Sequence, residues 1–440
     1  MSWAKLETAA VARALAAIAA EAGDLAEVYF ERRMDACWPP PEAACGLRLR
    51  CEEGLSVRLV RGDRAWIASR DAIGGAELAS ALRQVARAQP PALPEPELAV
   101  APPPAVPLAT LRGFAAELER AIRKHHVAFP FRLTTNWHRR DVQVVGPRWV
   151  PESEREVFYS VEVELPWGRF GSLATALQAG EAERVARSLV ARFRGRDAAP
   201  PPDGRYPLLL APGATAVMLH EAVGHALEAD LMEESGRERE LEGAPGAVPL
   251  DVLDDPRRAP RGVDRTTDDE GQAVVRRWLI RGGIADQPIA DALHAARSEM
   301  LLPGSGFRAD RHQAPLPRTH HLELLPGDAD PPHLLRAAEG GLAIGELDQG
   351  TLDPQTGEVV LYAPGGRFIR NGELAESCGP LRLRSRVPEL LAAVTAVGAD
   401  PQSAGAGWCA KGGQRRAVWA TAPSVVLAPM EIFGGRSGER

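Results

Sequence analysis

Two clusters of proline divide the chain into stretches with different patterns. The first cluster, PPALPEPELAVAPPPAVP, covers residues 90–107, and the second is Pro200–Pro202. Proline lacks an amide hydrogen and has a fixed backbone angle, so such segments form extended connections. A chain of 440 residues also exceeds one ordinary domain. These features predict an N-terminal domain over 1–205 and a C-terminal domain over 206–440.

Helical and alternating patterns follow one another before residue 205. Apolar residues at helical spacing predict helices over about residues 5–22, 76–88, 108–126 and 180–195. Alternating apolar and polar residues predict a meander of short strands after the first helix, and further strands near 142–145 and 157–165. Turns are expected at Glu52-Glu53-Gly54 and at Arg61-Gly62-Asp63.

The pattern changes after residue 206. Leu208-Leu209-Leu210 predicts a buried strand, a helix follows from about Ala214, and short strands with Gly-Gly turns fill the remainder. No repeat of fixed period is present, which disfavours a solenoid or propeller. The predicted fold class is α+β, with a mixed α/β-meander N-terminal domain and a β-rich C-terminal domain that carries one key helix.

The composition excludes several classes of protein. The formal charge is −7, which argues against a nucleic-acid partner because phosphate binding requires a basic surface. No run of about 20 apolar residues is present, so we expect no membrane span. The Ala-rich N-terminus lacks a basic segment with a cleavage site, which predicts a cytoplasmic protein. Five cysteines without a C-x-x-C pair favour neither a disulfide framework nor a zinc ribbon.

The segment VMLHEAVGHALEAD contains His220, Glu221 and His225 in the arrangement H-E-x-x-x-H. Two imidazoles and a carboxylate on one apolar helix are the groups of a hydrolytic zinc site. Five residues of regular α-helix would place the imidazoles about 140° apart, too far around the axis to bind one ion. A single π-type turn would realign them, and Gly224 lowers the resistance to it. The spacing therefore predicts a bulged or locally unwound helix over Ala222–His225.

A third protein ligand is expected, because a catalytic zinc ion takes three and leaves a fourth position for water. The residues alone leave Glu228, Asp230 and a distant cysteine as candidates. Cys409 lies in GAGWCAKGG, where glycines allow close approach of the backbone and Lys411 could stabilise a thiolate. An ordinary buried thiol is the alternative interpretation of Cys409.

A separate acidic run, Asp268-Asp269-Glu270, raises the question of a second metal ion. The run is followed by Gly271, and a turn closed by this glycine explains it without a metal. We therefore expect a turn here.

Several segments resemble the TldD/PmbA family, in particular its metal-binding TldD-type members. The resemblance runs from about residue 10 to 435, with segments in the same order: HEAVGHALEAD, DDEG, LIRGG, RHQAPLPR, LLPGD, GTLDPQTGEV, GRFIRNGEL and GWCAKGGQ. Two stretches depart from the family pattern. Residues 231–250 are shorter and more polar, and Thr319–Glu323 stands where the family carries a Met-Thr-Asn-Thr-Tyr-like run. Both departures bear on substrate preference.

The resemblance implies that His220, His225 and Cys409 bind one Zn²⁺ per chain, and that Glu221 is the catalytic acid and base. It implies a cytoplasmic peptidase that cuts unfolded or extended peptides. Family members act as dimers, so the expected assembly is a homodimer or a heterodimer with a PmbA-type subunit that lacks the metal motif.

The expected reaction is hydrolysis of a peptide bond. Zinc would act as a Lewis acid, and Glu221 would take a proton from water and deliver it to the leaving amine. Arg318, His320 and His321 are candidates for substrate binding and for stabilising the tetrahedral intermediate, with solvent-facing loop positions as the alternative. An accessible sheet edge would take an extended peptide as an added strand. The competing hypotheses are a non-catalytic peptide-binding partner subunit and a structural zinc protein with a fourth ligand.

Overall fold

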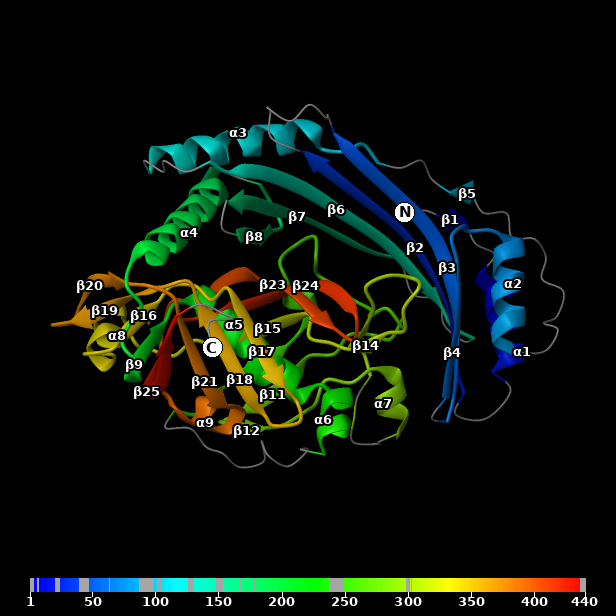
Figure 1. Ribbon diagram of the computed structural model, residues 1–440. Helices are drawn as coiled ribbons and strands as arrows, with labels where there is room; N and C mark the ends of the chain where they lie inside the picture. The colour runs from blue at the N-terminus through cyan, green and yellow to red at the C-terminus, as the bar shows by residue number, and fades with distance from the viewer. Residues whose placement is uncertain are drawn as a thin grey trace.

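A computed structural model describes most of the chain. The described residues are 4–5, 8–19, 24–38, 47–62, 64–86, 99–100, 104–125, 130–147, 153–165, 168–177, 179–236, 248–297, 301 and 303–435. Over these residues the protein mixes helices and strands, with a long N-terminal sheet arched over a β-rich C-terminal part (Figure 1). The predicted α+β fold is confirmed. Most of the divergent stretch 231–250 lies outside the described residues.

The N-terminal sheet is antiparallel and has six strands among the described residues. In order across the sheet they are β4 (Arg64–Arg70), β3 (Arg48–Arg61), β2 (Leu25–Trp38), β6 (Arg132–Val145), β7 (Glu154–Leu165) and β8 (Gly168–Ala174). The three central strands have 14 residues each, which gives the sheet its length. Figure 1 shows its concave side facing the C-terminal part.

Helices cover the two ends of this sheet. They are α1 (Thr8–Ile18), α2 (Gly75–Ala86), α3 (Leu108–Lys124) and α4 (Ala179–Asp197), with the short pair β1 (Ala4–Lys5) and β5 (Ala99–Val100) beside them. The first two helices pack on strands β2 and β3 through one apolar cluster, and the last two pack on β6 and β7 through another. All four predicted helices are confirmed, with ends shifted by a few residues.

One predicted turn in this sheet is wrong. Strand β3 runs without interruption through Glu52, Glu53 and Gly54, where we expected the chain to turn. A Cβ on Gly54 would lie 2.4 Å from Nε of Arg311, so this glycine makes room for an arginine of the C-terminal part. A glycine that permits close approach and one that permits a turn look alike in sequence. The turn at Gly62, with φ +56°, is confirmed.

The C-terminal part contains two larger sheets. One has the order β17 (Gln349–Asp353), β18 (Glu358–Ala363), β21 (Leu381–Arg386), β25 (Val425–Gly434), β9 (Gly204–Leu210), β16 (Leu342–Ile344), β19 (Gly366–Arg370) and β20 (Glu373–Cys378), with β22 (Val394–Val397) also pairing β25. The other has the order β12 (Ile284–Ala285), β11 (Arg277–Arg281), β10 (Val252–Asp254), β15 (His321–Leu324), β24 (Gln414–Ala422) and β23 (Gln402–Lys411). The predicted domain boundary at residue 205 falls within β9.

The remaining elements are short. They are α5 (Pro212–Leu219), the π-helix η1 (His220–Gly224), the 3₁₀-helices η2 (His225–Leu227) and η3 (Pro256–Arg258), α6 (Ala229–Ser235), α7 (Ala292–Arg297), α8 (Pro331–Ala337), α9 (Val387–Ala392) and the pair β13 (Gly306–Phe307) and β14 (Leu316–Pro317). Helix α5 shares one apolar core with both larger sheets, contributing Met218 and Leu219 to it. The helix that precedes the H-E-x-x-x-H motif is therefore anchored between the sheets.

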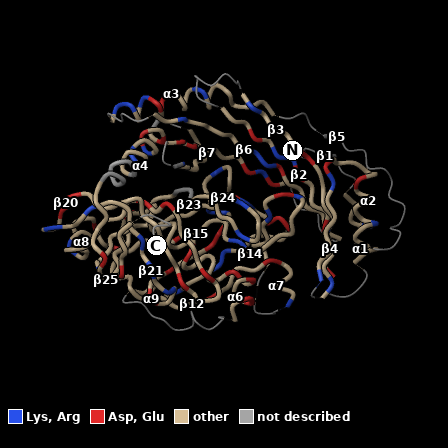
Figure 2. Tube along the Cα trace, in the orientation of Figure 1, with Lys and Arg blue, Asp and Glu red and all other residues tan. Residues whose placement is uncertain are grey.

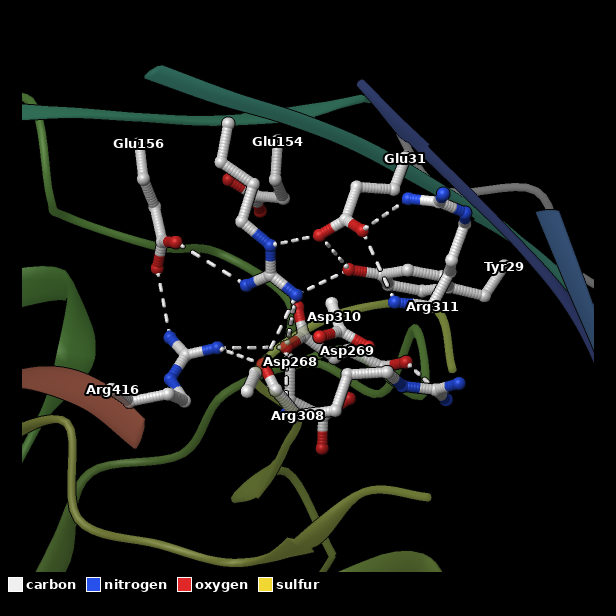
Figure 3. A network of polar contacts seen from close by, with 12 residues as sticks. Tyr29, Glu31, Glu154, Glu156, Asp268, Asp269, Arg308, Asp310, Arg311 and Arg416 are labelled. Atoms are coloured by element: carbon white, nitrogen blue, oxygen red, sulfur yellow. Dashed lines mark hydrogen bonds and ion pairs between the residues drawn. The ribbon is translucent and has the colours of Figure 1, made fainter. Parts of the chain in front are cut away.

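Charged side chains join the N-terminal sheet to the C-terminal part. We call this set the bridging ion network; it consists of Arg140, Arg265, Arg308, Arg416, Glu27, Glu31, Glu156 and Asp269. All eight side chains are buried. Figure 3 shows part of the network, with Glu31, Glu156, Asp269, Arg308 and Arg416 labelled. Figure 2 shows acidic and basic residues intermingled along this junction, with neither sign dominating. Opposite charges thus meet in pairs across it.

None of the described helices combines the length and the hydropathy needed to cross a membrane. This agrees with the absence of a long apolar run in the sequence.

Candidate metal centre

The helix that carries the H-E-x-x-x-H motif changes its winding at the motif. Regular α5 ends at Leu219, η1 is π-helical over His220–Gly224, and η2 is a 3₁₀-turn over His225–Leu227. The amide of His225 donates to the carbonyl of His220, which is the i to i+5 bond of a π-turn. The two imidazole centroids lie 4.5 Å apart. The change of winding predicted from the five-residue spacing is confirmed.

Gly224 has a role in this turn that differs from the predicted one. Its backbone is right-handed helical, with φ −55° and ψ −68°, so any residue could adopt these angles. A Cβ at this position would lie 2.9 Å from Cγ2 of Thr319 and 3.3 Å from Cδ1 of Leu322. The glycine therefore lets the segment around Thr319 pack directly on the π-turn.

Cys409 meets the two histidines from a distant part of the chain. Strand β23 pairs with β24, and β24 pairs in parallel with β15, which brings β23 against α5. The Sγ atom of Cys409 lies 3.3 Å from Nε2 of His225. One ligand atom from each of His220, His225 and Cys409 lies within 4.8 Å of the others, and all three residues are buried. This is the group of potential metal ligands found among the described residues.

The far nitrogen of each imidazole has a neighbour that orients the ring. Nδ1 of His225 lies 2.7 Å from Oε2 of Glu228, and Nδ1 of His220 lies 3.3 Å from Oγ1 of Thr319. Nε2 of His220 is buried and has no hydrogen-bond partner among the residues that the structure describes. A buried polar atom without a partner is costly, and coordination of an ion would satisfy it. The donor set therefore fits a metal ion, and two nitrogens with one sulfur suit zinc.

Local electrostatics favour the form of Cys409 that binds metal. Burial alone would raise the pKa of this thiol, but the neighbouring imidazoles of His220 and His225 outweigh burial and lower the pKa to about 6. Burial alone would lower the pKa of His225, but Glu228 and Cys409 raise it well above the ordinary value. The thiolate is the ligating form of cysteine, so the site prepares the sulfur for an ion.

The other two candidates for the third ligand are engaged elsewhere. Glu228 contacts the far nitrogen of His225, and Asp230 accepts from Nζ of Lys411 at 2.6 Å. Lys411 was expected to stabilise the thiolate of Cys409. Its ammonium instead donates to Glu228, to Asp230 and to the carbonyl of Pro317. That expectation was wrong, because the side chain of Lys411 reaches toward the acidic residues that follow the motif.

Glu221 is partly exposed and lies beside the edge of the nine-stranded sheet. Strand β17 ends that sheet, and its residues alternate between exposed and partly exposed. A Cβ on Gly350 in this strand would lie 2.3 Å from Cγ of Glu221, so the glycine provides the space that the glutamate occupies. Sequence reasoning missed both Gly350 and Thr319. Only the contact itself distinguishes Gly350 from the other glycines of the chain.

Arg318, His320 and His321 are buried rather than solvent-facing. Nη2 of Arg318 donates to the carbonyls of Lys411 and Gln414, which fixes the turn between β23 and β24. The ring of His320 contacts the carbonyl of Val263 at 2.6 Å. Nε2 of His321 lies 3.3 Å from Oγ1 of Thr421. These side chains secure the strands next to the three-ligand group, and their role toward substrate stays a prediction.

The acidic run at Asp268 forms the expected turn, but within the protein interior. Gly271 closes it with φ +74°, and its amide donates to the carbonyl of Asp268. The carboxylate of Asp268 accepts from the amides of Glu270, Gln272 and Gly306. Asp269 belongs to the bridging ion network. The run is therefore accounted for by structural contacts.

The fold is that of an α+β protein, and its candidate metal site combines a helix that contains a π-turn with the strand that carries Cys409. The sequence profile of the PmbA/TldA metallopeptidase C-terminal domain matches residues 203–434, more than half of the chain. The chain therefore belongs to the PmbA/TldD family of metallopeptidases.

Known proteins agree with this placement. A metalloprotease from Methanothermobacter thermautotrophicus is 30% identical over 241 residues, which are 54% of this chain and 52% of that protein. A metalloprotease TldD homolog from Buchnera aphidicola is 25% identical over 236 residues, or 53% of this chain and 49% of that protein. The chain thus spans about half the length of the curated relatives it matches. The crystal structure of TldE from Thermococcus kodakarensis shares the fold, with a TM-score of 0.69, 17% identity and coverage of 93% of this chain and 96% of that one.

Proposed function

We propose that this protein is a zinc-dependent peptidase that hydrolyses peptide bonds of unfolded or extended peptides. The observation that carries the proposal is that one ligand atom from each of His220, His225 and Cys409 lies within 4.8 Å of the others, with Glu221 next to His220 in the chain. Membership of a metallopeptidase family and the metalloprotease names of its relatives support it.

In this proposal His220, His225 and Cys409 would hold one zinc ion. The ion would supply Lewis-acid polarisation of the peptide carbonyl and of water. Glu221 is partly exposed, so water and substrate can reach its carboxylate. It would take a proton from the attacking water and return it to the leaving amine. Glu228 and Thr319 orient the two imidazoles through their far nitrogens.

Strand β17 suggests how a peptide would be bound. It is the edge strand nearest Glu221, and an extended peptide added to it would be held through its backbone, with little selection of sequence. Such binding requires a chain that can extend. Linear peptides should therefore be cut faster than cyclised peptides of the same sequence, and equal rates would contradict this mode of capture.

The assembly and the location are parts of the same proposal. We expect a cytoplasmic protein that forms a homodimer or pairs with a PmbA-type subunit, as the family resemblance implies. A non-catalytic peptide-binding subunit is the alternative, and an intact set of three ligands with a neighbouring glutamate disfavours it.

The test of the proposed function is the variant Glu221→Gln. It removes the proton-accepting carboxylate and leaves the three ligands, so zinc content should stay at about one ion per chain. Hydrolysis of an unfolded polypeptide should fall by about 10²–10⁴-fold, the usual contribution of a general acid and base. The zinc content is measured by atomic absorption and the rate by release of new amino termini. If the variant cleaves as fast as the parent, Glu221 is not the general acid and base.

A further inference from the structure

One buried carboxylate connects the segments that carry the three candidate ligands. Oε2 of Glu228 lies 2.7 Å from Nδ1 of His225 and 2.8 Å from Nζ of Lys411. Oε1 of the same residue accepts from the backbone amide of Thr319 at 3.4 Å. Glu228 is only 1% exposed, so water does not compete for these contacts. Three segments far apart in sequence therefore meet on one side chain.

The local winding explains how Glu228 reaches His225. Residues three apart lie directly above one another in a 3₁₀-turn, and η2 places Glu228 in that position relative to His225. The π-turn before it aligns His220 with His225, which are five apart. The backbone then becomes extended at Glu228, with φ −78° and ψ 123°, before α6 begins. Two successive departures from α-helical winding thus align three side chains.

Lys411 makes the second connection, from the cysteine strand. It follows Cys409 by two residues, and residues two apart in a strand share a face of the sheet. Its ammonium is buried, with 7% of the side chain exposed, and it also contacts Asp230 and the carbonyl of Pro317. The turn that follows it is fixed by Arg318, as described above. The position of Lys411 therefore determines where Cys409 lies relative to the helix.

Thr319 makes the third connection. Its amide faces Glu228, while its hydroxyl lies 3.3 Å from Nδ1 of His220. The backbone segment that contacts Glu228 is thus the one that orients the other histidine. His220, His225 and Cys409 are each one or two contacts away from this carboxylate.

We propose that Glu228 is a positioning residue for the metal site, which sets the separation of the two imidazole nitrogens and the sulfur. By accepting the proton of Nδ1, it fixes His225 in the tautomer whose Nε2 is free to bind an ion. By pairing with Lys411, it fixes the cysteine strand against the same helix. This inference rests on the metal site of the proposed function and adds the residue that assembles it.

The test compares Glu228→Gln with Lys411→Met, and uses Glu233→Gln as the matched control. Glu233 lies on α6, is largely exposed and pairs with Arg297, away from the ligands. The probe is Co²⁺ added to chelator-treated full-length protein, with affinity measured by competition against a chromophoric chelator. The near-ultraviolet sulfur-to-cobalt absorption band reports on Cys409. Circular dichroism establishes that each variant is folded.

We expect Glu228→Gln to weaken Co²⁺ binding by about 10–100-fold, the usual effect of losing the partner of a metal-bound histidine. The sulfur-to-cobalt band should weaken in Glu228→Gln and in Lys411→Met, and should be unchanged in Glu233→Gln. A purely structural role would lower the unfolding midpoint without changing the band of the folded protein. If either folded variant binds Co²⁺ like the parent with a full band, the positioning role is wrong.

The same titration separates this inference from the proposed function. A parent protein that gives no sulfur-to-cobalt band would overturn both the metal site and the positioning role. A parent that gives the band but cleaves no peptide would overturn the peptidase function alone. In that case the weakened band of Glu228→Gln would still support the positioning role.

Discussion

The protein buries two polar clusters that differ in composition: one consists of paired charges and the other of candidate metal ligands. In the bridging ion network, Asp269 and Glu156 each contact the same three guanidinium groups, those of Arg140, Arg265 and Arg416. In the candidate metal centre, one ligand atom from each of three residues lies within 4.8 Å of the others, and the buried Nε2 of His220 has no hydrogen-bond partner among the described residues. In the first cluster each charge is paired with an opposite charge, although Nε of Arg265 and Nε of Arg308 have no hydrogen-bond partner among the described residues. In the second cluster, coordination of an ion would satisfy the buried nitrogen of His220.

This difference separates a structural cluster from a binding site. Burial alone would raise the pKa of Asp269 and Glu156, but the three arginines outweigh burial and hold both pKa values well below the ordinary range. The network is thus ionised and paired at neutral pH. The two clusters are adjacent, because Arg416 on β24 lies opposite Cys409 on β23. The network therefore supports the strand that carries the sulfur.

The largest expected effect comes from breaking the network at Asp269. The variant Asp269→Asn keeps the size of the side chain but leaves three buried guanidinium groups short of a charge. Removing one partner of a buried ion pair costs about 3–5 kcal/mol, and we expect that loss in the free energy of unfolding measured with urea. The control Glu119→Gln breaks an exposed helix pair with Arg123 and should cost about 0.3–0.5 kcal/mol. Equal losses of unfolding free energy in the two variants would show that Asp269 stabilises the fold no more than an exposed ion pair does.

The next effect is a pH dependence of the free energy of unfolding, which arises from His320 at the edge of the network. Burial lowers the pKa of His320 to about 4, against roughly 6.5 in an unfolded chain. Between these values the unfolded state binds a proton that the folded state does not, so the free energy of unfolding falls as the pH falls. Over that window the loss is about 3 kcal/mol at most, from 1.36 kcal/mol per pKa unit.

The variant His320→Gln removes this titration and keeps a donor toward the carbonyl of Val263. Urea unfolding of chelator-treated protein from pH 7 to pH 4 should therefore give a shallower curve for the variant. The difference between the two curves isolates His320 from the other titrating groups. Parallel curves for parent and variant would mean that His320 has the same pKa in the folded and unfolded states.

The smallest of these effects is expected at Gly350, on the side of the metal centre. An added Cβ would meet Cγ of Glu221 at 2.3 Å, so Gly350→Ala should displace the side chain of Glu221, the proposed general base. A misplacement of about 1 Å can cost about 10²-fold in rate, and we expect a loss of that size. Co²⁺ affinity should not change, because Glu221 is not among the three ligands.

The matched control for Gly350→Ala is Gly345→Ala. Apart from its two chain neighbours, no described residue has a heavy atom within 4 Å of a Cβ built on Gly345, so the rate of Gly345→Ala should match the parent. If Gly350→Ala cleaves peptides as fast as Gly345→Ala, Glu221 does not act from the position seen here.

Local patterns predicted the elements well and the long-range contacts poorly. The helix periods gave α1 to α4, and the five-residue interval between His220 and His225 predicted a change of winding that the structure contains. The turn predicted at Gly54 failed, because that glycine accommodates Arg311 from a distant segment. Lys411 was assigned to the thiolate and contacts Glu228 and Asp230 instead. In both failures the decisive partner lies far away in sequence.

The sequence alone determined the α+β class, the helix that carries two histidines and a glutamate, and the need for a π-turn, because these depend on residue spacing along one stretch of backbone. Only the tertiary structure decided which sulfur joins them, which carboxylate orients His225 and which glycine makes room for Glu221. Those choices depend on the parallel pairing of β15 with β24 and on how side chains of distant segments fit together. His220 and Cys409, for example, are about 190 residues apart in sequence. Spacing within a strand or helix carries no information about such distances.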